Sequence, residues 1–93
     1  MPTVDVELIG TLRQHVGKKR FSSYLTEHAT IFSLFENLKN HECLNNLFND
    51  DYGILRSKIL IFVNGQEISI LNGLETELKS GDTITLIPVF HGG

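Results

Sequence analysis

Apolar and polar residues alternate in the first segment of the chain. In residues 4–8, valine and leucine occupy every second position, with aspartate and glutamate between them. This period-two pattern predicts a strand with one buried and one polar face. The mostly polar residues 11–19 that follow Gly10 predict a loop or turn, and residues 20–25 predict a second strand, antiparallel to the first.

The pattern changes to a helical period after Thr30. Four apolar residues follow at positions i, i+3, i+4 and i+7, namely Ile31, Leu34, Phe35 and Leu38. This spacing predicts an amphipathic helix, and the Thr30 hydroxyl can cap it by accepting a hydrogen bond from an amide of the first turn. A shorter apolar stripe in residues 43–55 predicts a second short helix at the edge of the domain.

Residues 59–63 are continuously apolar and rich in β-branched side chains, which predicts the strongest strand of the chain. Asn64-Gly65 predicts a tight hairpin, because a type I′ turn needs positive φ at both central positions. The rest of the pattern predicts a short returning strand, an ordered connection and a last strand, at residues 66–70, 71–82 and 83–89.

The order of these elements places one long helix between two hairpin-like halves. A single helix can cover only one face of a small sheet. We therefore expect an α+β protein with the β-grasp (ubiquitin-like) fold: a mixed sheet of four to five strands with one main helix packed on one face. The first and last strands are expected to lie side by side at the centre of the sheet.

The composition fits one globular domain. Of the 93 residues, 41% are hydrophobic and 20% are charged, which are ordinary values. We expect the domain to span residues 1–90 and a flexible tail to span residues 91–93. The net charge of −3 and the pI near 5.7 argue against a nucleic-acid partner. The one basic cluster, residues 18–20, lies where a solvated turn is expected.

Several absences in the sequence narrow the functional classes. No run approaches about eighteen apolar residues, and the first residues lack the regions of a signal peptide. Cys43 is the only cysteine and fits a reducing compartment. We therefore expect a cytoplasmic protein without a membrane partner. The four histidines are scattered without ligand spacing, so no metal site is expected.

Apolar residues also occupy positions that the period-two pattern assigns to the outside of the sheet. In the third strand these residues are Leu60 and Phe62, and in the last strand they are Ile87 and Val89. Together with Phe90 they predict a partner-binding surface, because exposed apolar patches of a few hundred Å² usually mark interfaces. The alternative is that the second helix or a loop covers these residues.

The sequence ends on Phe90-His91-Gly92-Gly93 directly after the last predicted strand. Four extended residues reach about 13 Å, enough to enter a narrow channel in another protein. Glycine lets a foreign backbone approach closely. His91 and Gly92 are therefore interpreted as a projecting tail, and the carboxylate of Gly93 as the group on which chemistry takes place. The alternative is a frayed end without function.

These features resemble the ubiquitin-like sulfur carriers of the MoaD/ThiS superfamily, most closely the small subunit of molybdopterin synthase. The resemblance covers nearly the whole chain and is carried by Leu12-Arg13, the Thr30-capped helix, Phe62-Val63-Asn64-Gly65, residues 73–82 with their Gly81-Asp82 turn, and the ending Ile87-Pro88-Val89-Phe90-His91-Gly92-Gly93. Two departures stand out. Many family members carry two prolines where this chain has Pro88 and Val89. His91 resembles the eukaryotic and archaeal carriers that modify tRNA or protein lysines.

The resemblance implies a mechanism centred on Gly93. An adenylating enzyme of the MoeB/ThiF type would bind the outer surface and use ATP to convert the Gly93 carboxylate to an acyl-adenylate. A sulfur donor would then produce a thiocarboxylate for molybdenum cofactor biosynthesis, with the large subunit of molybdopterin synthase as second partner. The chain itself would bind no cofactor and supply no catalytic side chain, acting only as a subunit of that transferase.

Two alternatives remain open at the level of sequence. The first is a ubiquitin-like protein modifier, joined through Gly93 to lysines of target proteins, or a carrier for tRNA thiolation. The second is a β-grasp interaction module without chemistry of its own.

Overall fold

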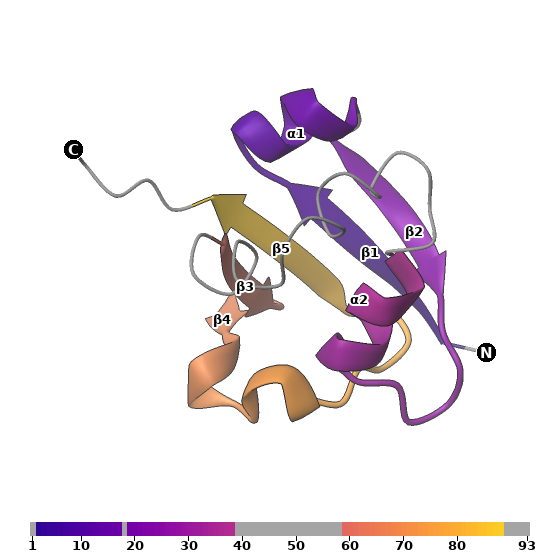
Figure 1. Cartoon of the computed structure of the whole chain (residues 1–93). Coiled ribbons are helices and arrows are strands. Elements are labelled where there is room, and N and C mark those ends of the chain that lie inside the picture. The colour runs from indigo at the N-terminus through magenta and orange to yellow at the C-terminus, as the bar shows by residue number, and fades with distance from the viewer. Residues whose placement is uncertain (1, 18, 39–58, 89–93) are drawn as a thin grey trace.

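The computed structural model describes residues 2–17, 19–38 and 59–88. In chain order the elements are β1 (Thr3–Leu8), α1 (Thr11–Val16), β2 (Arg20–Tyr24), α2 (Ile31–Leu38), β3 (Ile59–Val63), β4 (Gln66–Glu67), the 3₁₀ turns η1 (Ile68–Ile70) and η2 (Gly73–Glu75), and β5 (Thr83–Pro88). The strands form one sheet in the order β2-β1-β5-β3-β4 (Figure 1). The division into a domain at residues 1–90 and a tail at 91–93 stays a prediction, because it falls on residues outside those described.

Strand β5 lies in the middle of the sheet. It pairs in parallel with β1, where Val6 lies opposite Ile84, and antiparallel with β3, where Ile61 lies opposite Leu86. The expected side-by-side placement of the first and last strands is therefore confirmed. The β-grasp fold and its mixed sheet are confirmed with it.

Helix α2 packs across one face of this sheet and closes the core (Figure 1). All four residues of the predicted apolar stripe are buried, with Leu34 and Leu38 fully so. They meet the inward-facing residues of the central strands: Val4, Val6, Leu8, Ile59, Ile61, Val63, Ile84 and Leu86. Burying a leucine or isoleucine side chain stabilises the fold by roughly 1.5–3 kcal/mol, so this interlayer contact is the main source of stability.

The predicted cap of α2 is present as a reciprocal pair of hydrogen bonds. The backbone N–H of Ser33 donates to Thr30 Oγ1 at 3.2 Å, and the N–H of Thr30 donates to Ser33 Oγ at 2.9 Å. Two amides that the helix cannot satisfy internally thus find partners. The helix begins where the sequence places its start.

The Asn64-Gly65 hairpin is also confirmed, with φ of 51° and 85° at the two central positions. The Asn64 side chain also makes two hydrogen bonds to residues outside the turn. Its amide donates to Asp82 Oδ1 at 2.9 Å, and its carbonyl oxygen accepts from the N–H of Thr83 at 2.9 Å. The β3–β4 turn is thereby joined to the start of β5.

Two sequence expectations are wrong in part. The expected loop at residues 11–19 contains the six-residue helix α1, which ends at Gly17 with φ of 83°. Burial of Leu12 against the core overrides the polar composition of this segment. The expected strand at residues 66–70 is a strand only over Gln66–Glu67 and then turns into η1. The predicted second helix at residues 43–55 lies outside the described residues.

Candidate functional site

The end of β5 is held on both sides. Leu86 lies opposite Leu8 of β1, and the last two residues of the strand, Ile87 and Pro88, lie opposite Leu60 and Ile59 of β3. A central strand paired along both edges is a fixed support for whatever follows it. The predicted site residues Val89, Phe90, His91, Gly92 and Gly93 follow directly and lie outside the described residues.

Three of the predicted partner-binding residues come together on the face of the sheet opposite α2. Leu60 and Ile87 lie directly across from each other on β3 and β5, and Phe62 is two residues further along β3, opposite Thr85. Leu60 is 41% exposed, while Phe62 and Ile87 are half-buried. We call Leu60, Phe62 and Ile87 the outer-face patch. Its role in binding a partner stays a prediction.

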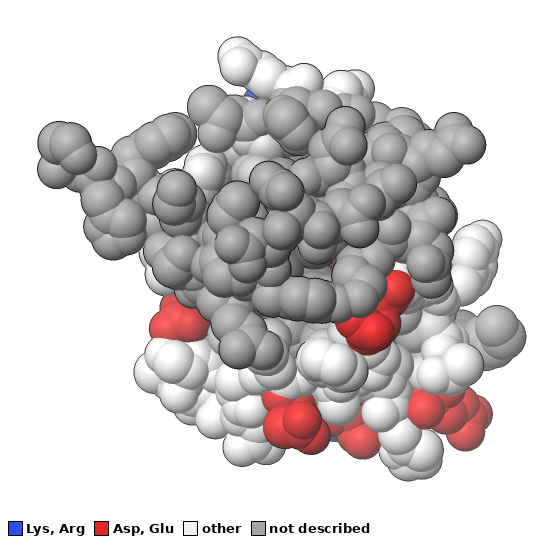
Figure 2. Space-filling model, in the orientation of Figure 1, with Lys and Arg blue, Asp and Glu red and all other residues white. Residues whose placement is uncertain are grey.

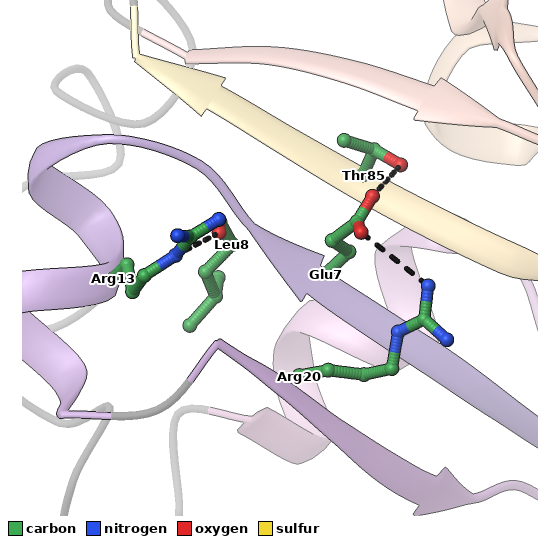
Figure 3. A network of polar contacts seen from close by, with 5 residues as sticks. All are labelled: Glu7, Leu8, Arg13, Arg20 and Thr85. Atoms are coloured by element: carbon green, nitrogen blue, oxygen red, sulfur yellow. Dashed lines mark hydrogen bonds and ion pairs between the residues drawn. The ribbon is translucent and has the colours of Figure 1, made fainter.

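A polar network borders the outer-face patch (Figure 3). Thr85 Oγ1 donates to Glu7 Oε1 at 3.4 Å, and Arg20 Nη2 donates to Glu7 Oε2 at 3.3 Å. The ion pair is largely exposed, so it stabilises the fold by only about 0.2–1 kcal/mol. Sequence reasoning placed Glu7 on the outside and missed its partners. The opposite charges at facing positions of two antiparallel strands are the signal that could have found them.

Helix α1 lies against the end of β5. The N–H of Ile9 donates to the carbonyl of Leu86 at 3.1 Å. A Cβ on Gly10, whose φ is 62°, would lie 3.5 Å from Pro88 Cγ, so this turn passes close to the last described residue of β5. Arg13 of α1 turns back and donates from Nε to the Leu8 carbonyl at 3.3 Å (Figure 3). The apolar Leu12 within a polar segment is the signal for α1 that sequence reasoning left unused.

A shallow hollow of about 280 Å³ adjoins the outer-face patch. It is lined by Ile59, Leu60, Ile61, Glu67, Ile68, Ser69, Gly73 and Leu74. Hydrogen bonds from the Ser69 hydroxyl and backbone amide lower the pKa of Glu67 below its ordinary value, so this carboxylate is ionised at neutral pH. The hollow is at the small end of the size range of ligand sites.

The chemistry that the described residues can perform is narrow. Within residues 2–17, 19–38 and 59–88, no three His, Cys, Asp or Glu side chains gather in a way that could hold a metal ion. Every buried side-chain nitrogen or oxygen in the same residues has a hydrogen-bond partner. The described part of the chain also contains no helix long and apolar enough to cross a membrane. What the structure offers is the outer-face patch beside a fixed strand end.

The parallel pairing of β1 with a central β5, together with one helix on one face, defines a ubiquitin-like β-grasp protein. The chain belongs to the ThiS family, whose sequence model matches residues 6–93. It is therefore a member of the MoaD/ThiS superfamily of ubiquitin-like sulfur carriers.

Individual relatives have different described roles. The small archaeal modifier protein 1 of Methanosarcina acetivorans is 31% identical, with a TM-score of 0.73 over 100% of this chain and 98% of its own. A candidate sulfur carrier protein of Archaeoglobus fulgidus is 46% identical over 41 residues, which is 44% of this chain and 47% of that protein. The chain thus matches about half the length of that relative. A candidate molybdopterin converting factor subunit 1 of Pyrococcus furiosus shares the fold, at 24% identity, a TM-score of 0.76, and coverage of 97% and 100%.

Proposed function

We propose that the protein carries sulfur on the carboxylate of Gly93, in the cytoplasm. The observation that carries this proposal is the position of β5. This strand is central, is paired with β1 up to Leu86 and with β3 up to Pro88, and precedes the last five residues of the sequence, which end in Gly92-Gly93. A partner that docks on the patch therefore meets the tail at a fixed starting point.

The chemistry follows from the poor reactivity of a carboxylate. Its charge repels nucleophiles, and it has no good leaving group. In the proposed first step, a Gly93 oxygen attacks the α-phosphorus of ATP, forming an acyl-adenylate and releasing pyrophosphate. In the second step, the outer sulfur of a donor persulfide attacks the acyl carbon and AMP leaves, which gives an acyl disulfide. A second thiol then attacks the donor's sulfur, so that the thiocarboxylate leaves and the two thiols end as a disulfide. An adenylating enzyme of the MoeB/ThiF type supplies the ATP site and the catalytic groups.

The outer-face patch is the proposed docking site of that enzyme. Leu60 is exposed enough to become buried on binding, and the neighbouring hollow can receive a side chain from the partner. Val89 and Phe90 are proposed to extend the contact toward the tail. The same surface would next face an acceptor protein, so activation and delivery would alternate on one face.

For the acceptor, we propose the precursor of molybdopterin, bound by the large subunit of molybdopterin synthase. The support for this choice is the likeness to the small subunit of that synthase in the Gly81-Asp82 turn and in the residues from Ile87 to Gly93. A second candidate is a modifier role, in which Gly93 is joined to target lysines. The relation to the Methanosarcina modifier, at 31% identity over the full chain, supports this second candidate.

Mass spectrometry of the native protein from its host tests the proposal. We expect a species heavier by the difference between one sulfur and one oxygen atom, located on the C-terminal peptide that ends in Gly93. Pyrophosphate exchange with the host's adenylating enzyme tests activation separately. Lysine-linked conjugates would favour the modifier, whereas loss of molybdenum cofactor in a deletion strain would favour the synthase subunit. The absence of both the heavier species and the pyrophosphate exchange would contradict the carrier function.

A further inference from the structure

The two ends of the sheet carry different charge. We call the end where β1 and β5 finish and β2 begins the tail end, and the described basic residues Arg13, Lys19 and Arg20 lie there. Among the described residues, the opposite end and its flanking loops carry the carboxylates of Asp5, Glu27, Glu75, Glu77 and Asp82, with Lys79 among them. Glu7 and Glu67 lie in the same row of the sheet as Arg20, and Glu7 is paired with it. Figure 2 shows several exposed carboxylates in the lower half of this view.

Two of these basic side chains differ in what they contact. Arg20 is paired with Glu7. Arg13 has no carboxylate within ion-pair distance among the described residues, and its one hydrogen bond runs from Nε to the Leu8 carbonyl. That bond orients the guanidinium, and its two terminal nitrogens have no hydrogen bond to any other described residue. These form the planar fork that binds a carboxylate through two parallel hydrogen bonds.

Arg13 is also fixed relative to the start of the tail. Its N–H donates to the carbonyl of Gly10 at 3.0 Å, and the turn at Gly10 passes close to Pro88. Any protein that takes in the residues after Pro88 must therefore lie over the tail end. Its surface around the tail then faces Arg13 and Lys19.

We propose that the tail end docks on an acidic protein surface, so that the partner that takes the tail carries carboxylates around the entry and Arg13 pairs with one of them. This inference rests on the proposed function and names the chemistry of the partner. A nucleic acid fits poorly, because the net charge of −3 and the carboxylates of the opposite end repel phosphates. Such charge pairing acts mainly on the rate of association and the orientation of docking.

The test measures association of the full chain with the purified ThiF/MoeB-type adenylating enzyme of the same host, by stopped flow. Arg13→Glu is compared with Lys79→Glu, which makes the same change of charge at the opposite end. We expect Arg13→Glu to lower the association rate about tenfold at about 0.1 M salt and much less at about 1 M. Lys79→Glu should change the rate less than about twofold. Arg13→Lys, which keeps the charge, should retain most of the wild-type rate.

Equal effects of Arg13→Glu and Lys79→Glu, or an effect independent of salt, would overturn the inference. Tighter binding of the wild-type chain to bulk tRNA than to the enzyme at the same salt would also overturn it. Circular dichroism on each variant separates misfolding from lost docking, and Arg13→Lys serves as the folded reference. If the wild-type chain is adenylated while Arg13→Glu associates normally, only this inference fails. If the wild-type chain is not adenylated at all, the proposed function fails.

Discussion

The two faces of the sheet use the same strands for different purposes. On the inner face, alternate residues of β1, β3 and β5 pack against α2 and are almost completely buried. On the outer face, the β1 half presents Asp5 and Glu7, whereas the β3 half presents the outer-face patch. A core needs apolar residues on one face only. Leu60, the most exposed residue of the outer-face patch, lies outside this core, and a partner-binding role for the patch stays a proposal.

The largest expected effect comes from a change that touches neither face. Deleting Gly92 and Gly93 should abolish adenylation, because the proposed reacting carboxylate is moved about 7 Å toward Pro88. Pyrophosphate exchange measures the loss. Appending one residue should have a similar effect, since a displacement of about 1 Å can already cost about 100-fold in rate. The melting temperature of both variants should match that of the wild type, and normal exchange by the truncated chain would contradict the carrier role.

Next in size is a change on the inner face. Leu34→Ala should lower the free energy of unfolding by about 2–5 kcal/mol, because it leaves a cavity under α2 where the wild-type side chain is fully buried. Denaturant unfolding measures this loss. Binding to the adenylating enzyme should be unchanged at temperatures where the variant is folded. A cost below about 1 kcal/mol would mean that α2 contributes less to the core than its burial indicates.

A change on the outer face should weaken binding to the partner and leave the free energy of unfolding nearly unchanged. Leu60→Asp should weaken binding to the adenylating enzyme by about 2 kcal/mol or more, because a charge is buried without a partner at the interface. Its free energy of unfolding should change by no more than about 0.5 kcal/mol, since Leu60 is exposed. Tyr24→Asp is the matched control, an exposed aromatic on β2 at the far side of the same face. Equal weakening by both variants would place the docking surface elsewhere.

Phe62 sharpens the same comparison because it is half-buried. Because Phe62 is less exposed than Leu60, replacing it with aspartate should also lower the free energy of unfolding, by about 1 kcal/mol. Leu60 is therefore the cleaner probe of binding, because a substitution of Phe62 should change both the free energy of unfolding and the binding affinity.

The smallest expected effect is a pH dependence at the border of the outer-face patch. Ser69 lowers the folded-state pKa of Glu67. The stabilisation from this carboxylate is therefore present above its unfolded-state pKa and is lost as the pH falls through the folded-state pKa. Wild type and Glu67→Gln should differ in melting temperature at neutral pH and converge in acid. A difference that stays constant down to low pH would contradict this account.

Much of the fold follows from local sequence. The stripe from Ile31 to Leu38 and the cap at Thr30 specify α2, because helical period and capping depend on residues within one turn or two. The Asn64-Gly65 hairpin is equally local, since the backbone preferences of two residues decide it. The alternation along β3 correctly separates its buried side from Leu60 and Phe62. These features need no knowledge of distant segments.

Other features depend on residues brought together from far along the chain. Helix α1 forms in a polar segment because the core that buries Leu12 is built by other elements. The contact of Glu7 with Thr85 joins residues 78 positions apart and arises only from the parallel pairing of β1 with β5. The same pairing brings Arg13 to the end of the strand that leads into the tail. The sequence determined α2, the Asn64-Gly65 hairpin and the apolar faces, because these depend on neighbouring residues. The tertiary structure decided which charges lie near the end of β5, because those residues come from distant parts of the chain.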